Sequence, residues 1–314
     1  MPAGRHEIDA LLHRTDTFIF DCDGVLYTPE GTVPQVPAAL ATLRRAGKRI
    51  LFVTNGGSST REELQASLTR KGYEAEISEI FGAAYLTAVY LRSNAHLGAG
   101  DKVYVAGAPG MASEIRRHAG LEVLGGGDDN DRVGCSVEEI VLEPLDPAVR
   151  VVVMGGDAAG FSYYKVSKCV RYLVENAGCE FVLANPDMRF PIASARAVDP
   201  GREGSLHSYL PAAGAQAACV SACTGRSPIV VGKPSKLAME LIMAEHGIEP
   251  TRTAMVGDTL DTDIEFGNVS GVSTVLVLTG NTSEEAGVAA RAGKRPALII
   301  SSAADLLYVR GAAL

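Results

Sequence analysis

A ten-residue segment near the amino terminus places two acidic residues directly after an apolar run. Residues 18–27 have the sequence FIFDCDGVLY. Asp21 directly follows three apolar residues, and Asp23 comes two residues later. A short apolar run of this kind is typical of a buried strand in a parallel sheet. Residues two apart in an extended chain point to the same side, and open parallel sheets bind ligands at the carboxyl ends of their strands. The segment therefore predicts two carboxylates at a ligand-binding edge, where they can hold a hard cation and do covalent chemistry.

The composition is that of an acidic globular chain. The 314 residues carry a net charge of -8, and 46% of them are hydrophobic, enough for the core of one large domain or two smaller ones. No cluster of lysine or arginine stands out, which argues against a nucleic-acid surface. No apolar run approaches the length of a membrane span, and the mixed polar start of the sequence has no signal-peptide core. We therefore expect a cytoplasmic protein that binds neither nucleic acid nor a membrane.

Two other features of the sequence invite a metal assignment. The six cysteines are scattered without a CxxC pair, so we expect buried thiols; Cys219 and Cys223, one helical turn apart, leave a metal or redox alternative open. Residues 125–134 form a glycine- and aspartate-rich loop, GGGDDNDRVG. An EF-hand needs a ligand at position five, a glycine at position six and a glutamate at position twelve. Counting from Asp128 or from Asp129, the loop does not supply all three. We interpret the loop as a solvated turn with no assigned role.

Strands and helices alternate through both ends of the chain and through its middle, which predicts parallel sheets. For the two ends we expect strands at 18–20, 49–53, 229–231, 253–256, 274–277 and 297–300 and helices at 38–46, 60–71 and 237–246. For the middle we expect strands at 102–106, 121–124, 151–154 and 181–183, helices at 111–118 and 164–175, a long loop at 189–204, and a small-residue helix from Ser205 or His207. The predicted domains are 1–94 with 226–314, and an inserted α/β domain at 95–225.

Three more strand ends of the predicted sheet carry polar residues. In chain order they are Thr54 and Asn55 after the strand at 49–53, Lys233 after the strand at 229–231, and Asp258, Asp261 and Asp263 after the strand at 253–256. The first pair offers hydroxyl, amide and backbone N–H groups at the start of a helix, which is an anion site, and a lysine can bind phosphate as a point charge. Each pattern alone is common in turns and helix caps. Together with Asp21 and Asp23 they predict one site in which acids, an anion nest and a lysine converge.

The four segments DCDGV, VTN, GKPS and GDTLDTD resemble, in this order, the four motifs of the haloacid dehalogenase (HAD) superfamily of phosphatases with an aspartate nucleophile. The segments at 155–173 and 181–187 resemble the type-IIA (C2) cap of its 4-nitrophenylphosphatase, phosphoglycolate phosphatase and pyridoxal phosphate phosphatase branch. The resemblance covers nearly the whole chain. It implies an α/β fold with a Rossmann-like parallel-sheet HAD core at 1–94 and 226–314, and an inserted α/β cap at 95–225 that decides the substrate.

The resemblance also implies a role for each site residue. Asp21 is expected to attack the substrate phosphorus, and Asp23 to protonate the leaving alkoxide and then activate water. A Mg²⁺ ion is expected on the carboxylates of Asp21 and Asp258 and the backbone carbonyl of Asp23. The other expected members are Thr54, Asn55 and Lys233 for the phosphoryl oxygens, Asp263 or alternatively Asp261 for the metal waters, and Asn185, Asp187 and Arg189 of the cap for the leaving group. For Asn185, a turn begun by Asn-Pro is an equal alternative.

The function implied by the resemblance is Mg²⁺-dependent hydrolysis of small phosphomonoesters through an aspartyl-phosphate, as in 4-nitrophenylphosphatase or phosphoglycolate phosphatase. The alternatives are a NagD-like nucleoside monophosphatase and, after it, a pyridoxal phosphate phosphatase. A receiver-type signalling domain is disfavoured by the inserted domain and by Asp23. A silent binding module would be expected to lose Asp21, Asp23 or Asp258, and all three are present. Related caps form homodimers, and the small-residue helix at 205–223 suits such an interface, although core packing explains it equally well.

Overall fold

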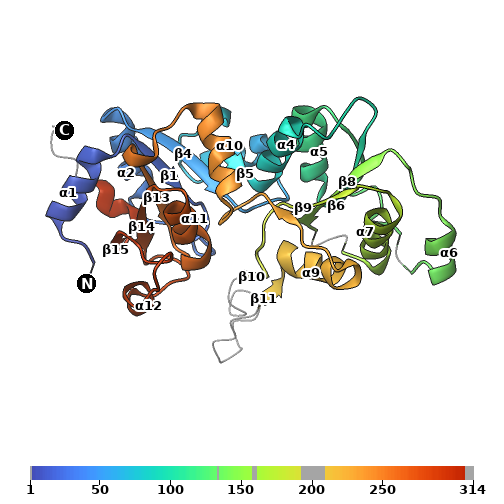
Figure 1. Cartoon of the computed structure of the whole chain (residues 1–314). Helices are drawn as coiled ribbons and strands as arrows, with labels where there is room; N and C mark the ends of the chain where they lie inside the picture. Colours follow the sequence, from blue (N-terminus) through green and yellow to red (C-terminus); the bar gives the residue numbers. More distant parts are fainter. Residues whose placement is uncertain (1, 133, 158–160, 192–208, 308–314) are drawn as a thin grey trace. The chain divides into compact units, whose positions relative to one another are not determined.

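The chain divides into two compact units, both drawn in Figure 1. The computed structural model describes residues 2–132, 134–157, 161–191 and 209–307. Unit 1 consists of Met1–Thr54, Arg61–Gly82 and Lys233–Leu314, and unit 2 of Asn55–Thr60 and Ala83–Gly232. The sequence-based boundaries at 94 and 226 differ from this division at three places, one of which is the segment 226–232, expected in the core but part of unit 2. Helix α4 (Ala83–Ser93) and the short segment Asn55–Thr60 make their contacts with unit 2.

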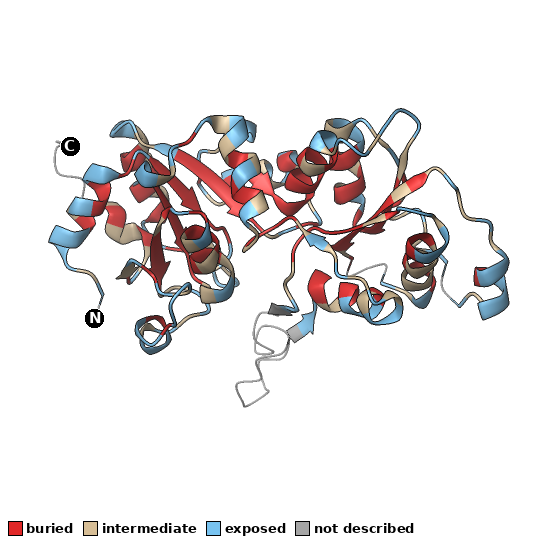
Figure 2. Cartoon of the chain, in the orientation of Figure 1, coloured by how far each residue is buried: buried red, intermediate tan, exposed pale blue. Residues whose placement is uncertain are grey.

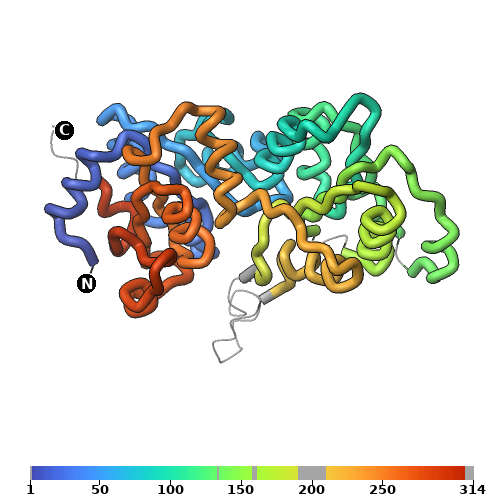
Figure 3. Tube along the Cα trace, in the orientation of Figure 1, coloured from blue at the N-terminus to red at the C-terminus, as the bar shows by residue number. Residues whose placement is uncertain are grey.

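Unit 1 is built on a parallel sheet of six strands in the order β15-β14-β13-β1-β4-β5. In β1, Phe18 pairs with Ala254 on one side and with Ile50 on the other. The strands come from both ends of the chain, blue and orange to red in Figure 3. Their bounds are β1 Thr17–Phe20, β4 Arg49–Thr54, β5 Ile80–Gly82, β13 Thr253–Gly257, β14 Ser273–Val277 and β15 Leu298–Ile300. The predicted pairing of the two chain ends in one sheet is thus present, except for the strand expected at 229–231. That strand is β12 (Ile229–Val230), which pairs with β9 (Glu180–Leu183) in the sheet of unit 2.

Helices and a small hairpin complete unit 1. Pro37 lies in the first turn of α2, where its missing N–H leaves no hydrogen bond unmade, and Leu40 and Leu43 of this helix join Phe18 and Phe52 in the core. The described α-helices are α1 Arg5–Arg14, α2 Val36–Arg45, α3 Arg61–Arg70, α10 Lys236–His246, α11 Glu265–Val269 and α12 Glu284–Val288. The hairpin pairs β2 (Tyr27–Thr28) with β3 (Gly31–Thr32), and 3₁₀ turns occupy Ile77–Glu79, Pro250–Arg252 and Ala303–Leu307.

Unit 2 has its own parallel sheet, in the order β12-β9-β8-β6-β7. Its strands are β6 Lys102–Gly107, β7 Glu122–Gly125, β8 Val149–Gly156, β9 Glu180–Leu183 and β12 Ile229–Val230. Among its described residues the helices, besides α4, are α5 Pro109–Ala119, α6 Val137–Leu142, α7 Tyr163–Glu175 and α9 Ala213–Thr224. In both units the sheet strands are largely buried, as the red ribbon of Figure 2 shows. This burial is expected of parallel strands covered on both faces.

The segment after β9 departs from the sequence prediction. Strand β10 (Arg189–Pro191) pairs in antiparallel fashion with β11 (Tyr209–Pro211), so the predicted loop at 189–204 begins as a strand. The small-residue helix begins at Ala213, not at Ser205 or His207, both of which lie outside the described residues. A three-residue strand has too little alternation to be recognised without its partner. Ala217 and Val220 of α9 join the core of unit 2, so core packing accounts for one face of this helix.

The glycine- and aspartate-rich loop is anchored at Asp129 and Asn130 by side chains of unit 2. The Tyr104 hydroxyl donates to Asp129 Oδ2 at 2.8 Å. Lys165 of α7 donates to Asn130 Oδ1 and forms a 2.8 Å ion pair with Asp157, both partners of that pair being almost completely buried. Buried charges are stable when they are paired and hydrogen-bonded in this way. The interpretation of the loop as only a solvated turn was therefore incomplete.

The structure also bears on the expected burial of the cysteines and on the membrane-spanning character of the helices. All six cysteines are free thiols. Cys22, Cys169 and Cys179 are buried as expected, whereas Cys135 is half-buried and Cys219 and Cys223 on α9 are exposed, contrary to the expectation. In the ranges that the structure describes, no helix has both the length and the apolar character needed to cross a membrane.

Candidate active site

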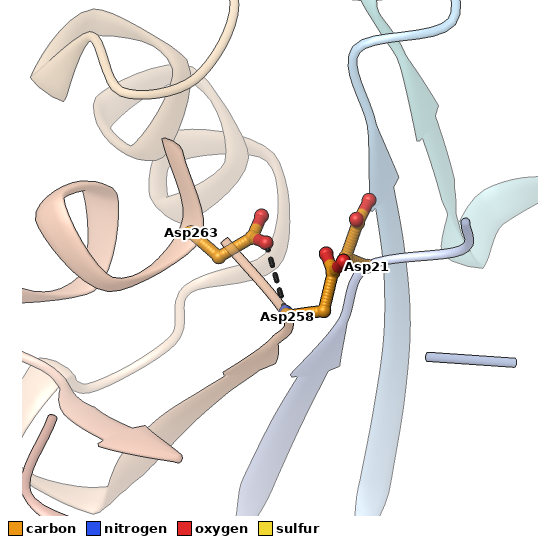
Figure 4. A group of neighbouring side chains, drawn as sticks. All are labelled: Asp21, Asp258 and Asp263. Carbon is orange, nitrogen blue, oxygen red and sulfur yellow. Dashed lines mark hydrogen bonds between the residues drawn. The ribbon is translucent and has the colours of Figure 1, made fainter. Parts of the chain in front are cut away.

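Three carboxylates meet at the carboxyl ends of strands β1 and β13 (Figure 4). Asp21 follows β1, Asp258 follows β13, and Asp263 lies in the π-helical turn Leu260–Ile264. One oxygen of each carboxylate lies within 4.8 Å of the other two, and all three residues are buried. The backbone N–H of Asp21 donates to the carbonyl of Val256 at 2.9 Å, which holds the ends of the two strands side by side. The structure thus brings together three of the residues that the sequence placed in one site.

Lys233 lies between two of these carboxylates. Its Nζ is 2.7 Å from Asp21 Oδ1 and 2.7 Å from Asp263 Oδ1, and it donates to the backbone oxygen of Val53 at 3.0 Å. The side chain is only 2% exposed. Contacts with the ends of β1 and β4 and with the π-helical turn therefore fix the ammonium group. We refer to Asp21, Asp258, Asp263 and Lys233 as the charge cluster.

Burial and mutual repulsion shift the protonation of the charge cluster. Burial raises the pKa of Asp21 well above its usual range, with Asp263 adding to the effect and Lys233 opposing it. Burial, and then Asp263, raises the pKa of Asp258 to about 6. Burial disfavours the ammonium form of Lys233, but Asp21 and Asp263 outweigh it and raise the pKa of the lysine. Three carboxylates face one ammonium, a surplus of two negative charges when all are ionised, which equals the charge of one divalent cation.

A loop that the sequence analysis did not assign holds the carboxylate of Asp258. Asn281 donates its backbone N–H and its side-chain amide to Asp258 Oδ2 at 2.7 and 2.8 Å, and the Thr259 hydroxyl donates to Oδ1 at 3.1 Å. Gly280 must be a glycine here, because a Cβ would lie 2.0 Å from Asp258 Oδ2. The available sequence signal was weak: Gly-Asn follows the strand at 274–277, as the other site residues follow their strands, but it is also a common turn sequence.

The π-helical turn separates Asp263 from Asp261. Asp263 Oδ2 accepts the backbone N–H groups of Asp258 and Thr259, each at 3.1 Å, and its other oxygen accepts from Lys233. It therefore fixes both the lysine and the turn that carries Asp258. Asp261, the alternative residue for orienting metal waters, instead pairs with Lys294 at 2.6 Å, and its side chain is 76% exposed. The structure thus places Asp263, and not Asp261, in the charge cluster.

Thr54 lies at the end of β4, and Asp23 lies in the turn that follows β1. The backbone turn at Asp23 is closed by a 2.8 Å hydrogen bond from the N–H of Gly24 to the carbonyl of Tyr27. Asp23 is an exposed residue, yet partial desolvation by the surrounding protein raises the pKa of its carboxyl group, against the opposing effect of Lys233 and then Lys71. Thr54 is buried as the last residue of β4.

The remaining predicted residues belong to unit 2, and three of them are hydrogen-bonded to one another. Asn55 Nδ2 donates to Asp187 Oδ1 and Oδ2 at 3.1 and 3.2 Å. Asn185 Nδ2 donates to the backbone oxygen of Asn55 at 2.7 Å, and Asn185 Oδ1 accepts the N–H of Asp187 at 3.1 Å. The last contact is the side-chain bond of an Asx turn, so the alternative of a turn at Asn185 is present as well. Arg189 begins β10 and is exposed.

Comparison with known sequences finds a hydrolase family and phosphatase relatives, which agree with the residues of this site. Residues 18–122 match a family model described as haloacid dehalogenase-like hydrolase, and residues 230–306 match a HAD-hydrolase-like model. The glycerol-3-phosphate phosphatase of Gallus gallus is 39% identical over 306 residues, which cover 95% of this chain and 93% of the relative. The chloroplastic phosphoglycolate phosphatase 1A of Arabidopsis thaliana is 36% identical, over 88% of this chain and 72% of the relative.

Comparison with solved structures gives the same result for the fold. The glycerol phosphate phosphatase of Mycobacterium tuberculosis, solved in complex with magnesium, superposes with a TM-score of 0.75 at 26% identity, covering 95% of this chain and 78% of that chain. The parallel sheets, the inserted α/β unit and the carboxylates at the strand ends agree with these hydrolase relatives. The chain belongs to the haloacid dehalogenase-like hydrolase family. The predicted family, the predicted fold class with its cap and the prediction of a phosphoric monoester hydrolase are confirmed.

Proposed function

We propose that the chain is a Mg²⁺-dependent phosphatase of small phosphomonoesters, in which Asp21 is the nucleophile and Asp23 the general acid and base. The charge cluster carries this proposal, because it joins a buried carboxylate at the end of β1 to a lysine and to two further acids. The relatives support it: phosphatases named for glycerol 3-phosphate and for phosphoglycolate are 39% and 36% identical over most of the chain.

The residues present fit a magnesium ion. Mg²⁺ prefers hard oxygen ligands, and the surplus of two negative charges in the cluster matches its charge. The carboxylates of Asp21 and Asp258 and the backbone carbonyl of Asp23 would hold it, with Asn281 keeping the Asp258 carboxylate in place. When bound, the ion would supply positive charge that stabilises the transferring phosphoryl group. The related M. tuberculosis structure in complex with magnesium supports this choice of metal.

The chemical steps use the chain's own groups. A carboxylate oxygen of Asp21 bonds to phosphorus as the bond from phosphorus to the ester oxygen breaks, and Asp23 gives that oxygen a proton, so the alcohol leaves. Asp23, now a carboxylate, takes a proton from a water molecule whose oxygen attacks the phosphorus. The bond from phosphorus to Asp21 then breaks, which releases phosphate and restores both acids. Thr54, Asn55 and Lys233 are the proposed partners of the phosphoryl oxygens.

The substrate class proposed first is a phosphate ester of a small alcohol or hydroxy acid, such as glycerol 3-phosphate or 2-phosphoglycolate. The named relatives support this class. The alternatives drawn from the sequence, a nucleoside monophosphate and pyridoxal 5′-phosphate, enter as competing substrates in the test below. The cytoplasmic location and a homodimer formed through the cap stay predictions.

Phosphate release from a substrate panel tests the proposed function. We expect hydrolysis of 4-nitrophenyl phosphate, glycerol 3-phosphate and 2-phosphoglycolate with Mg²⁺, and loss of at least about 100-fold in rate after chelation, because the surplus negative charge then repels the phosphoryl group. Activity should return when Mg²⁺ is added back. A preference for nucleoside monophosphates would favour the NagD-like alternative. Full activity without any divalent metal would contradict the proposal.

Removing the Asn281 side chain should weaken metal binding. In Asn281→Ala, one of the donors to Asp258 Oδ2 is lost, and we expect the affinity for Mg²⁺ to fall about 10- to 100-fold, as is typical when a group that orients a metal ligand is removed. Titration calorimetry with the metal alone measures this directly. Asn268→Ala is the matched control, since Asn268 donates to the backbone oxygens of Gly293 and Arg295 away from the charge cluster. Equal metal affinities in both variants would show that Asn281 does not position Asp258.

A further inference from the structure

A closed ring of hydrogen bonds joins the loop after β4 to the loop after β9, and both loops lie in unit 2. The Asn185 side chain binds the backbone oxygen of Asn55 and the backbone N–H of Asp187. The Asp187 carboxylate in turn accepts from the side-chain amide of Asn55 with both oxygens, at 3.1 and 3.2 Å. Each of the three residues therefore contacts the other two. Hydrogen bonds to an ionised carboxylate are among the stronger ones in proteins.

The loop that carries Asn55 is also packed tightly against the backbone of unit 2. A Cβ at Gly57 would lie 2.8 Å from the carbonyl of Gly155, and a Cβ at Gly110 would lie 2.2 Å from the carbonyl of Ser58. At the Asn55 side chain itself, a Cβ at Gly232 would lie 2.9 Å from Asn55 Oδ1. Distances this short exclude any side chain larger than that of glycine. The loop that follows Asn55 and the Asn55 side chain are therefore both closely packed within unit 2.

Asp187 determines which end of the Asn55 amide faces it. An asparagine amide can rotate by half a turn and exchange its N–H₂ group for its carbonyl oxygen. With Asp187 present, that rotation would bring the amide oxygen against a carboxylate, so the N–H₂ group stays toward Asp187. We propose that Asp187 is a positioning residue that orients Asn55 for the phosphoryl group, and does not read the leaving group. The inference rests on the proposed function, because it needs Asn55 to bind phosphoryl oxygens.

The two roles for Asp187 predict different results. A residue that reads the leaving group affects each ester differently and has no effect on inorganic phosphate, which carries no leaving group. A residue that orients a phosphoryl-binding amide affects every ester equally and also affects phosphate. A residue that acts through Asn55 has no further effect once the Asn55 side chain is gone, which a double-mutant cycle measures.

The experiment compares Asp187→Ala, Asn55→Ala and the double variant in the full chain with Mg²⁺. We expect Asp187→Ala to lower kcat/KM about tenfold or more and by the same factor for 4-nitrophenyl phosphate, glycerol 3-phosphate and 2-phosphoglycolate. Inhibition by inorganic phosphate should weaken in parallel, and the double variant should resemble Asn55→Ala. Asp187→Asn, which keeps an acceptor oxygen, should lose less. Asp128→Ala, at a 73% exposed aspartate of the same unit, is the control and should match the wild type.

Other outcomes overturn the inference while leaving the proposed function intact. One such outcome is that Asp187→Ala changes the order of kcat/KM among the esters and leaves the inhibition constant for phosphate unchanged. Another is that the losses of kcat/KM in the two single variants multiply in the double variant. Thermal unfolding checks that each variant is folded. If Asp187→Ala does not fold, Asp187→Asn replaces it in the same measurements. Failure of the proposed function is seen in the wild type itself, as absence of Mg²⁺-dependent hydrolysis. Calorimetric binding of inorganic phosphate to the wild type and Asp187→Ala then still decides the positioning role.

Discussion

Asp21→Asn is expected to lower kcat by at least about 10⁴-fold while the protein stays folded. An amide of the same shape has no anionic oxygen to attack phosphorus, so the covalent step is lost. The fold should persist because Lys233 keeps its 2.7 Å ion pair with Asp263 and its hydrogen bond to Val53. Phosphate release under saturating Mg²⁺ measures the rate, and thermal unfolding measures the stability.

The control for this variant lies at the other end of the same strand. Asp16 precedes β1 and pairs on the surface with Arg252, with its side chain 54% exposed. Asp16→Asn should leave kcat unchanged, because exposed ion pairs contribute little to stability and Asp16 is remote from the carboxyl end of the sheet. An Asp21→Asn enzyme with a rate within tenfold of the wild type would remove Asp21 from the role of nucleophile.

Lys233→Met is expected to lower the free energy of unfolding by about 3–5 kcal/mol in the absence of metal, and to reduce kcat strongly. The substitution leaves the buried carboxylates of Asp21 and Asp263 without their ammonium partner. Added Mg²⁺ should recover part of the lost stability, since it returns positive charge to the same carboxylates. Urea unfolding with and without Mg²⁺ measures both effects.

A second lysine close by in sequence provides the comparison for Lys233. Lys236 is 63% exposed and pairs with Glu240 one helical turn further along α10. Lys236→Met should change the free energy of unfolding by about 0.5 kcal/mol or less, because exposed pairs of this spacing contribute only that much. If Lys233→Met and Lys236→Met lowered the free energy of unfolding equally little, Lys233 would not be the counter-charge of the buried Asp21 and Asp263.

The part of the site that could be predicted from sequence depends on one geometric fact. The carboxyl ends of parallel strands share one edge of the sheet, so Asp21 and Asp258 could be placed together without knowledge of the packing. Lys233 was placed with them on the expectation that its strand belongs to the same sheet, whereas that strand, β12, pairs with β9 in the sheet of unit 2. Distinguishing Asp263 from Asp261 was harder, because the turn after β13 is π-helical and its geometry decides which acid turns inward. The sequence favoured Asp263 only through a resemblance, whereas the structure shows its contacts with Lys233 and with the N–H of Asp258.

The features that sequence analysis missed depend on contacts between distant segments. Asn281 follows its strand in a Gly-Asn pair that looks like any turn, and only the approach of that loop to Asp258 gives it a role. The bond between Asn55 and Asp187 spans 132 residues, so neither local pattern could show it. Strand β10 was expected to be loop because its partner β11 lies beyond residues 192–208. In each case the local sequence allowed several structures and the tertiary contacts selected one.

The discontinuous course of unit 1 has a consequence for the protein during its synthesis on the ribosome. Unit 2 ends at Gly232, so every residue it contains has been made before the segment Lys233–Leu314 begins. At that stage β1 has β4 beside it but lacks β13, its other neighbour. Lys233, Asp258 and Asp263 are also still to come. A nascent chain can therefore complete unit 2 while it has no charge cluster, and hydrolytic chemistry becomes available only when the final segment joins the sheet.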